Sequence, residues 1–174
     1  GGEKVGIAIK TLAEDVLTSA EFCNQKRRVA HLLTMYGFIL FVVSTAGMIF
    51  GYADSANAAA WPLLWHLGAL MVCVGGYWFW FFIRVDVAAE GNPWYRVVRA
   101  DLFILALLAT TTFALLWSVF GAIYFFVPFI AAATVLFGTV FWSKFAHMFF
   151  KPAAAFQKRV TKADGSMENL PEIP

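Results

Sequence analysis

Four long runs of apolar residues, separated by short polar segments, make up most of the chain. They cover approximately residues 29–52, 62–83, 100–118 and 122–149, and Lys151-Pro152 is expected to stop the last run. Each run reaches the roughly 20 residues that a helix needs to cross a hydrocarbon core of about 30 Å. Because lipid offers no hydrogen-bond partners to the backbone, we expect each run to be a transmembrane helix and not a loop.

Residues 5–22 show a different pattern, in which apolar positions recur at helical spacing between charged ones. The apolar positions are Val5, Ile9, Leu12, Val16, Leu17 and Ala20, and the charged ones are Lys10, Glu14, Asp15 and Glu21. This pattern predicts an amphipathic helix that is too polar to span a membrane. Such a helix either lies on the membrane surface or docks a partner protein, and the sequence favours neither alternative.

The sequence therefore predicts an all-α fold, an integral membrane four-helix bundle with an N-terminal amphipathic interfacial helix. Residues 1–28 would form the amphipathic helix on the cytoplasmic face, residues 29–150 the four-transmembrane-helix domain, and residues 151–174 a cytoplasmic tail. Composition agrees, because 61% of the residues are hydrophobic and 14% are charged. Soluble domains carry about 45–50% apolar and about 25% charged residues.

The distribution of basic residues predicts the orientation of the bundle. They precede the first run, lie between the second and third runs, and follow the fourth, whereas residues 54–61 and 118–121 contain none. Basic segments stay on the cytoplasmic side of a membrane. Four spans place all three basic segments on one side, so we expect a multi-pass protein of the cell (inner or plasma) membrane with both termini cytoplasmic.

Several function classes are disfavoured by what the sequence contains. The net charge is only +2, and no basic patch interleaved with aromatic residues suggests nucleic-acid binding. No glycine-rich phosphate loop, H-E-x-x-H motif or nucleophile elbow is present. The expected surroundings are membrane lipid and protein partners, with no nucleic acid.

Two of the three histidines are placed where they could hold one iron atom. His31 lies at the start of the first run and His147 at the end of the fourth, so both are expected at a similar depth on the cytoplasmic side. Two imidazoles that face each other across a bundle are what a six-coordinate haem b needs. The spacing alone leaves a plainer alternative open, in which both are solvated interfacial histidines.

Small and basic residues close to these histidines would suit a macrocycle. Gly37 and Gly138 would let a flat ring approach the helix backbone. Arg28 or Lys144 would pair with the haem propionates.

Two further polar residues, His66 and Asp101, are candidates for a quinone or proton site. His66, near the outer end of the second run, is either an interfacial polar residue or an acceptor of a quinol proton, and a second haem held by Met48 and His66 is a further alternative. Asp101, at the start of the third run, would pair with Arg99 or line a quinone pocket. The charge of Arg84 is explained by snorkelling into the headgroups.

Three segments resemble a known family. Residues 30–38, AHLLTMYGF, resemble the first core helix of the membrane cytochrome b subunits of the nitrate reductase gamma family. Residues 142–152, WSKFAHMFFKP, look like the end of that family's last helix, where a ligand histidine follows a Ser-Lys-Phe run. Residues 13–18 are similar to the approach segment of relatives in sulfur metabolism: the C subunit of the quinone-interacting membrane-bound oxidoreductase, the membrane subunit of the dissimilatory sulfite reductase complex and heterodisulfide-reductase-like proteins.

This resemblance covers most of residues 10–155 and implies specific roles. His31 and His147 would be the axial ligands of the haem nearest the cytoplasmic partner. Many family members hold a second haem, but the corresponding ligand positions here are Phe41 and Phe129, so we expect one haem b.

The implied function is electron transfer within an oxidoreductase complex. The chain would pass electrons between membrane quinone and soluble iron–sulfur or flavoprotein subunits on the cytoplasmic side, and would not be a catalyst alone. The amphipathic helix and the C-terminal tail would dock the soluble partner. The alternative is a haem-free membrane anchor or scaffold subunit, which explains the missing second ligand pair equally well.

Overall fold

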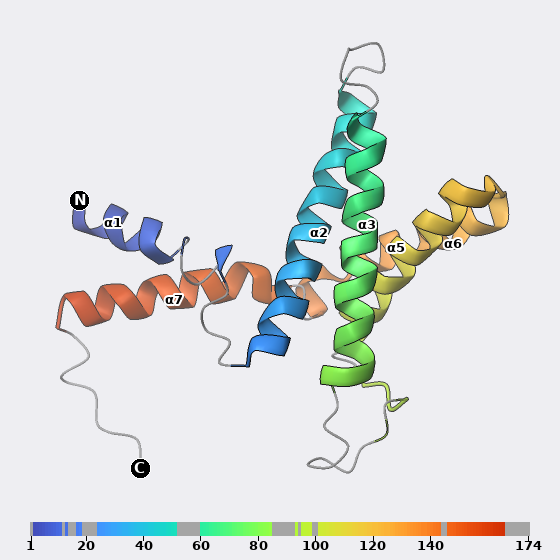
Figure 1. The fold of residues 1–174 in the computed structure, drawn as a ribbon. Coiled ribbons are helices and arrows are strands. Elements are labelled where there is room, and N and C mark those ends of the chain that lie inside the picture. Colours follow the sequence, from blue (N-terminus) through green and yellow to red (C-terminus); the bar gives the residue numbers. More distant parts are fainter. Residues whose placement is uncertain are drawn as a thin grey trace. The chain divides into compact units, whose positions relative to one another are not determined.

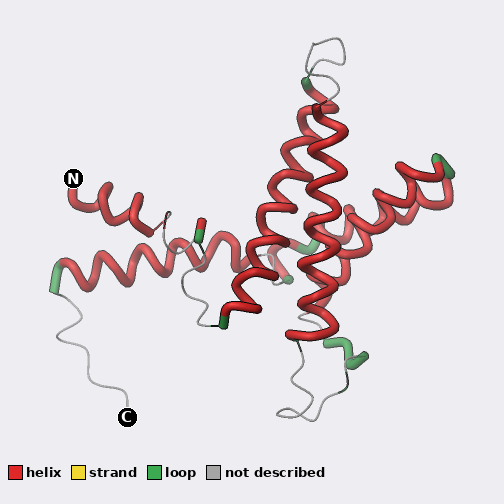
Figure 2. Tube along the Cα trace, in the orientation of Figure 1, coloured by secondary structure: helices red, strands yellow, loops and turns green. Residues whose placement is uncertain are grey.

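The computed structural model describes residues 2–11, 13, 17–18, 24–51, 60–84, 93, 95–98, 101–143 and 146–165. These residues form helices and their connecting turns, with no strand among them (Figures 1 and 2). The chain divides into two compact units. One is Asn24–Phe145, here called the bundle, and the other joins Gly1–Cys23 to Ala146–Pro174.

Three helices of the bundle are long and apolar enough to span a membrane. They are α2 (Gln25–Phe50), α3 (Ala60–Trp78) with its π-helical extension η2 (Phe79–Ile83), and α5 (Leu102–Phe120). This finding confirms three of the four expected apolar helices.

The ends of these helices follow from local backbone chemistry. The helix α2 begins at Gln25, four residues before the expected start, because the Asn24 side chain accepts hydrogen bonds from the amides of Lys26 (3.0 Å) and Arg27 (3.4 Å). The helix α5 ends at Phe120, and Gly121 follows in the left-handed conformation (φ 64°) that glycine adopts at helix ends. Gly121 thus lies at the turn between the third and fourth apolar runs.

The fourth expected span, a continuous helix over residues 122–149, is wrong. The helix α6 covers only Ile123–Gly138, η4 follows at Val140–Trp142, and α7 begins at His147. The break starts at Thr139, whose backbone leaves the helical region (φ −103°, ψ 15°), and Ser143 is fully extended. With 16 residues, α6 is about 24 Å long, shorter than a hydrocarbon core of about 30 Å.

The helix α7 also runs past the position where the fourth run was expected to stop. It continues through Pro152 to Ala163 and crosses the expected domain boundary at residue 150. Pro152 lies early in the helix, where its missing amide removes a single backbone hydrogen bond. Apolar residues alternate in α7 with Lys151, Lys158, Arg159 and Lys162, so the helix is amphipathic.

The helices α2 and α3 pack so closely that glycines are required between them. A Cβ atom on Gly68 would lie 2.6 Å from the Phe41 amide nitrogen and 2.8 Å from the Gly37 carbonyl oxygen. A Cβ on Gly75 would lie 2.8 Å from the Ala30 carbonyl oxygen. Backbone atoms cannot move aside cheaply, so these glycines set the distance between the two helices.

A hydrophobic cluster joins this helix pair to the α5–α6 hairpin. Its buried members are Phe41, Trp65, Ala69 and Ala114, with Leu115 and Phe129 packed against them. The Phe41 and Trp65 rings stack with centroids 5.1 Å apart, and the Trp65 indole nitrogen donates to the Thr45 hydroxyl at 3.0 Å. The cluster thus connects all four helices of the bundle.

The outward faces of the long helices remain apolar. Large hydrophobic side chains are exposed along their length, among them Val43, Ile49 and Phe50 on α2, Leu63, Leu70 and Val74 on α3, and Val119 on α5. Water-soluble monomers seldom expose contiguous apolar surface of this extent. These faces are compatible with contact to membrane lipid.

The second unit contains α1 (Gly2–Thr11), which packs against α7 (Figure 1). The expected amphipathic helix over residues 5–22 is seen in part: α1 ends at Thr11, and of the rest only residues 13, 17 and 18 are described. The expected loop at 54–61 lies almost wholly outside the described residues, as does the tail beyond residue 165. Residues 151–163, the first part of the expected tail, are helical.

We expect Gly68→Ala to lower the free energy of unfolding by about 1–3 kcal/mol, because the added methyl group overlaps backbone atoms of α2. Unfolding in mixed micelles, followed by circular dichroism, measures the change. Gly138→Ala is the matched control, since a Cβ there would meet no atom within 4 Å. Equal stability of the two variants would contradict the close contact of α2 and α3.

Candidate functional site

His31 lies on the stripe of α2 whose Phe38 contacts the end of α6. His31 lies in the second turn of α2 and is half-buried. Phe38 follows seven residues later, two helical turns along the same stripe. Its ring lies against that of Phe137 near the end of α6, with centroids 6.2 Å apart and planes inclined by 31°. The stripe that carries His31 therefore faces the last turn of α6.

The two glycines expected beside a macrocycle differ in their surroundings. Gly37 is in contact with α3, where a Cβ would lie 2.7 Å from the Met71 Cβ and 2.8 Å from the Gly68 carbonyl oxygen. Gly138, next to Phe137, has no atom within 4 Å of the Cβ position. Of the two, Gly138 is the position that leaves room for a flat ring.

The second expected iron ligand belongs to the other unit. His147 is the first residue of α7, but its side chain and the whole of Lys144 lie outside the described part of the structure. The pairing of His31 with His147 therefore stays a prediction. Arg28, expected near the propionates, lies in the first turn of α2 and is half-buried.

A haem and a bare metal ion differ in the protein ligands that they require. Among the described residues, no three His, Cys, Asp or Glu side chains gather to hold a metal. A porphyrin supplies its own ring nitrogens and needs only axial ligands from the protein. The sequence predicts these axial ligands at His31 and His147, of which the structure describes the half-buried side chain of His31.

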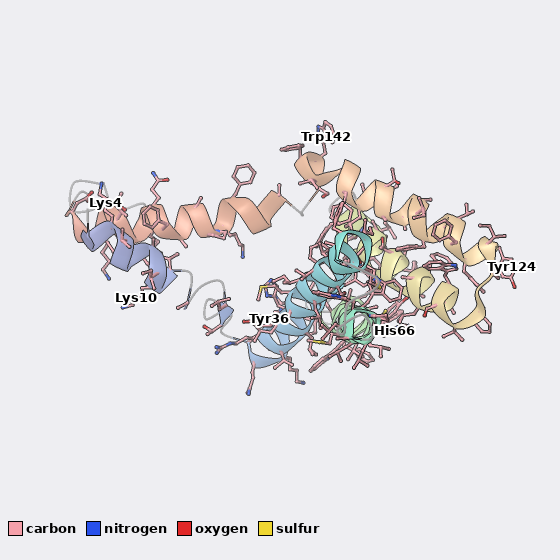
Figure 3. The ribbon with its side chains drawn as sticks, turned by 90° about the horizontal axis from the view of Figure 1, so that it is seen from above. Lys4, Lys10, Tyr36, His66, Tyr124 and Trp142 are labelled. Atoms are coloured by element: carbon pink, nitrogen blue, oxygen red, sulfur yellow. The ribbon has the colours of Figure 1, made fainter. Side chains whose placement is uncertain are left out.

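The imidazole of His66 ties α3 to α5 (Figure 3). Nδ1 lies 2.6 Å from the Pro62 carbonyl oxygen, which can only accept, so Nδ1 carries a proton. In the neutral ring, Nε2 accepts from the Ser118 hydroxyl at 2.5 Å. Both nitrogens are engaged, so a haem held by Met48 and His66 would find no free imidazole nitrogen. A role in quinol proton transfer stays a prediction.

Further polar contacts continue along the same interface of α3 and α5. The Cys73 thiol donates to the Thr111 hydroxyl at 3.4 Å, and the Tyr77 hydroxyl lies 2.8 Å from the Thr112 hydroxyl. Together with the His66–Ser118 pair we call these contacts the polar seam. Sequence reasoning missed it, although spacings of seven residues, 66 to 73 and 111 to 118, repeat on both helices.

A buried ion pair joins the end of η2 to the start of α5. The Arg84 Nε donates to Asp101 Oδ1 at 2.9 Å, and Nη2 donates to Oδ2. The two side chains are only 10% and 7% exposed. The backbone amide of Val98 also donates to Oδ2 at 2.9 Å, and the guanidinium lies 4.1 Å from the ring centroid of Trp80.

This geometry changes two expectations. Asp101 pairs with Arg84, whereas Arg99, its expected partner, lies outside the described residues. Arg84 does not snorkel outward, because its guanidinium is paired with Asp101 and is largely buried. Arg84 follows the π-helical turn η2, and its backbone amide donates to the Phe79 carbonyl oxygen at 2.7 Å. The Asp101 carboxylate accepts hydrogen bonds from the Arg84 guanidinium and the Val98 amide, and so holds the start of α5 next to the end of η2.

Comparisons with known proteins add no relative. The chain matches no protein-family model, and no curated protein and no solved structure is detectably similar to it. The resemblance to the nitrate reductase gamma family therefore stays a prediction.

We expect Asp101→Ala to lower the free energy of unfolding by about 3–5 kcal/mol, since it leaves the Arg84 charge buried without its counter-ion. The double variant Arg84→Met with Asp101→Leu removes both charges and is expected to recover most of this loss. Unfolding in mixed micelles measures both. A double variant as unstable as the single one would show that the charges do not act as a pair.

Proposed function

We propose that this chain is an integral membrane subunit that carries one haem b and passes electrons between membrane quinone and a soluble iron–sulfur or flavoprotein partner. The observation that carries the proposal is the placement of His31. The stripe of α2 that holds it faces the end of α6, through the contact of Phe38 with Phe137. The next helix along the chain, α7, begins with the second histidine.

In this proposal the chain's own residues bind and orient the cofactor. His31 and His147 would supply the two axial imidazoles, Gly138 would admit the edge of the ring, and Arg28 would neutralise a propionate. When bound, the haem supplies one-electron transfer, and the protein sets its position and surroundings.

The hydrophobic cluster supports a single haem. The family that the sequence resembles often carries a second haem, whose ligand positions correspond to Phe41 and Phe129 here. These two residues, from α2 and α6, both contact the cluster around Trp65. The two ligands of a second haem would have to face each other from these positions. Here the space between them is occupied by the aromatic and aliphatic side chains of the cluster.

The lipid contact that the proposal requires is supported by α2, α3 and α5. These helices have the length and apolar character of membrane spans, and their outward faces are hydrophobic. We propose the cell membrane as the location, with the end of the bundle that carries Arg28 and Arg84 on the cytoplasmic side.

A haem-free membrane anchor is the competing hypothesis, and one observation favours it. The backbone at Gly37, where a macrocycle was expected to approach, is covered by α3. An anchor would use the same bundle and need no ligand at His31.

The absorption spectrum of the protein distinguishes the cytochrome from the haem-free anchor. We expect the purified full chain, or the complex it is isolated with, to give a b-type pyridine haemochrome. His31→Ala and His147→Ala should each abolish it and leave membrane insertion intact. His66→Ala is the matched control and should retain the haem, because that imidazole is engaged by Pro62 and Ser118. A wild-type preparation without the haem spectrum would end the cytochrome proposal in favour of the anchor.

A further inference from the structure

The helix α7 carries a stripe of lysines on an exposed face. Lys151, Lys158 and Lys162 are spaced by seven and four residues, which places them within about 40° of each other around the helix. All three are exposed. The 17 residues of α7 include Arg159 as a further basic residue and no acidic one.

A neighbouring side of α7, centred about 110° around the helix from the stripe, is partly covered by its own chain. Its half-buried positions, Pro152, Ala155, Phe156, Arg159 and Val160, recur at helical spacing. The helix α1 packs against α7 within this unit. The lysine stripe thus lies on an exposed side of this helix pair.

Exposed apolar side chains accompany the basic ones. On α7, Phe150 is 70% exposed and directly precedes Lys151. On α1, Val5 and Ile9 lie one turn apart and are both largely exposed, and Lys4 and Lys10 flank them (Figure 3). Basic residues beside exposed apolar ones are the pattern of helices that lie in the headgroup region of a membrane.

The chain reaches α7 through residues suited to a membrane surface. Phe141 and Trp142, in η4 at the end of the bundle, are 84% and 80% exposed. Aromatic side chains of this kind concentrate at the level of the lipid headgroups. Only residues 143–146 separate them from α7 along the chain, so aromatic residues suited to the headgroup level directly precede the basic helix in sequence.

From these observations we propose that the α1–α7 pair binds anionic phospholipid headgroups of the bilayer that holds α2, α3 and α5. This inference rests on the membrane embedding proposed above, and it is independent of the haem. The lysines would contact the phosphates, while Phe150, Val5 and Ile9 would enter the upper acyl region. Each basic residue near an anionic surface adds to this attraction.

An anionic lipid fits this surface better than a protein partner does. Lysine is depleted at protein–protein interfaces, where Tyr, Trp and Arg are enriched. Long flexible lysine side chains bury their stems in an apolar layer and keep their charge among the headgroups. A dock for a soluble subunit, which the sequence allowed for the N-terminal helix, is the alternative that the experiment separates.

The test uses hydrogen–deuterium exchange of the purified full chain in nanodiscs. One set contains phosphatidylcholine alone, and the other contains phosphatidylcholine mixed with phosphatidylglycerol. We expect α7 amides to exchange about tenfold or more slowly in the anionic discs, with the difference lost at high salt. Equal exchange of α7 in both discs would overturn the proposal and leave protein docking as the use of this face.

Two variants make the result specific to charge. Replacing Lys151, Lys158 and Lys162 together with glutamine should remove the difference between the discs, whereas replacing the same residues with arginine should preserve it. A glutamine variant that still responds to phosphatidylglycerol would contradict the role of the lysine stripe. Circular dichroism on both variants checks that α7 still folds.

The same samples separate this inference from the proposed function. Slow exchange of α2, α3 and α5 amides in both kinds of disc reports membrane embedding, and rapid exchange there would refute it. The haem spectrum of the discs reports the cytochrome proposal. A sample with embedded spans, no haem and lipid-dependent α7 would support the lipid site and reject the cytochrome.

Discussion

The close contact between the backbones of α2 and α3 determines how the rest of the bundle is arranged. Around Gly37, Gly68 and Gly75 the helices approach until no Cβ atom fits between them. In lipid, apolar side chains gain little from leaving their surroundings, so backbone packing and polar contacts must hold helices together. This contact turns the opposite face of α3, with His66, Cys73 and Tyr77, toward α5.

The interface of α3 and α5 is held by other means. Hydroxyl, thiol and imidazole groups meet across it, and the Arg84–Asp101 pair closes its basic end. A buried ion pair is weak evidence for stability, but it specifies partners well, because each charge is costly without the other. Glycine contacts thus set a distance on one side of α3, and polar pairs set a register on its other side.

Much of the fold could be predicted from the sequence because long apolar runs allow few structures in a membrane. The positions of α2, α3 and α5 followed from this constraint alone. The break after Gly138 could not be predicted, since apolar residues continue beside Ser143, Lys144 and His147 up to residue 149 and the departure begins in the backbone of Thr139.

The candidate site was predicted less completely than the fold. Its histidines were evident because the chain has only three, but the partner of Asp101 was not, since the π-helical turn before Arg84 changes the direction of that side chain. The contact of Gly37 with α3 could not be predicted either, because a glycine allows the close approach of a cofactor or of a neighbouring helix equally well. Only the residues packed against it decide between them.

The shortness of α6 has a consequence for the lipid around the protein. If α6 crosses the bilayer beside three longer helices, the hydrocarbon must become thinner on that side of the bundle only. Exposed Phe141 and Trp142 at its end would mark where the dip in the surface lies. The protein would then deform the membrane asymmetrically. Other proteins with short transmembrane helices would match the thinner hydrocarbon layer best beside α6.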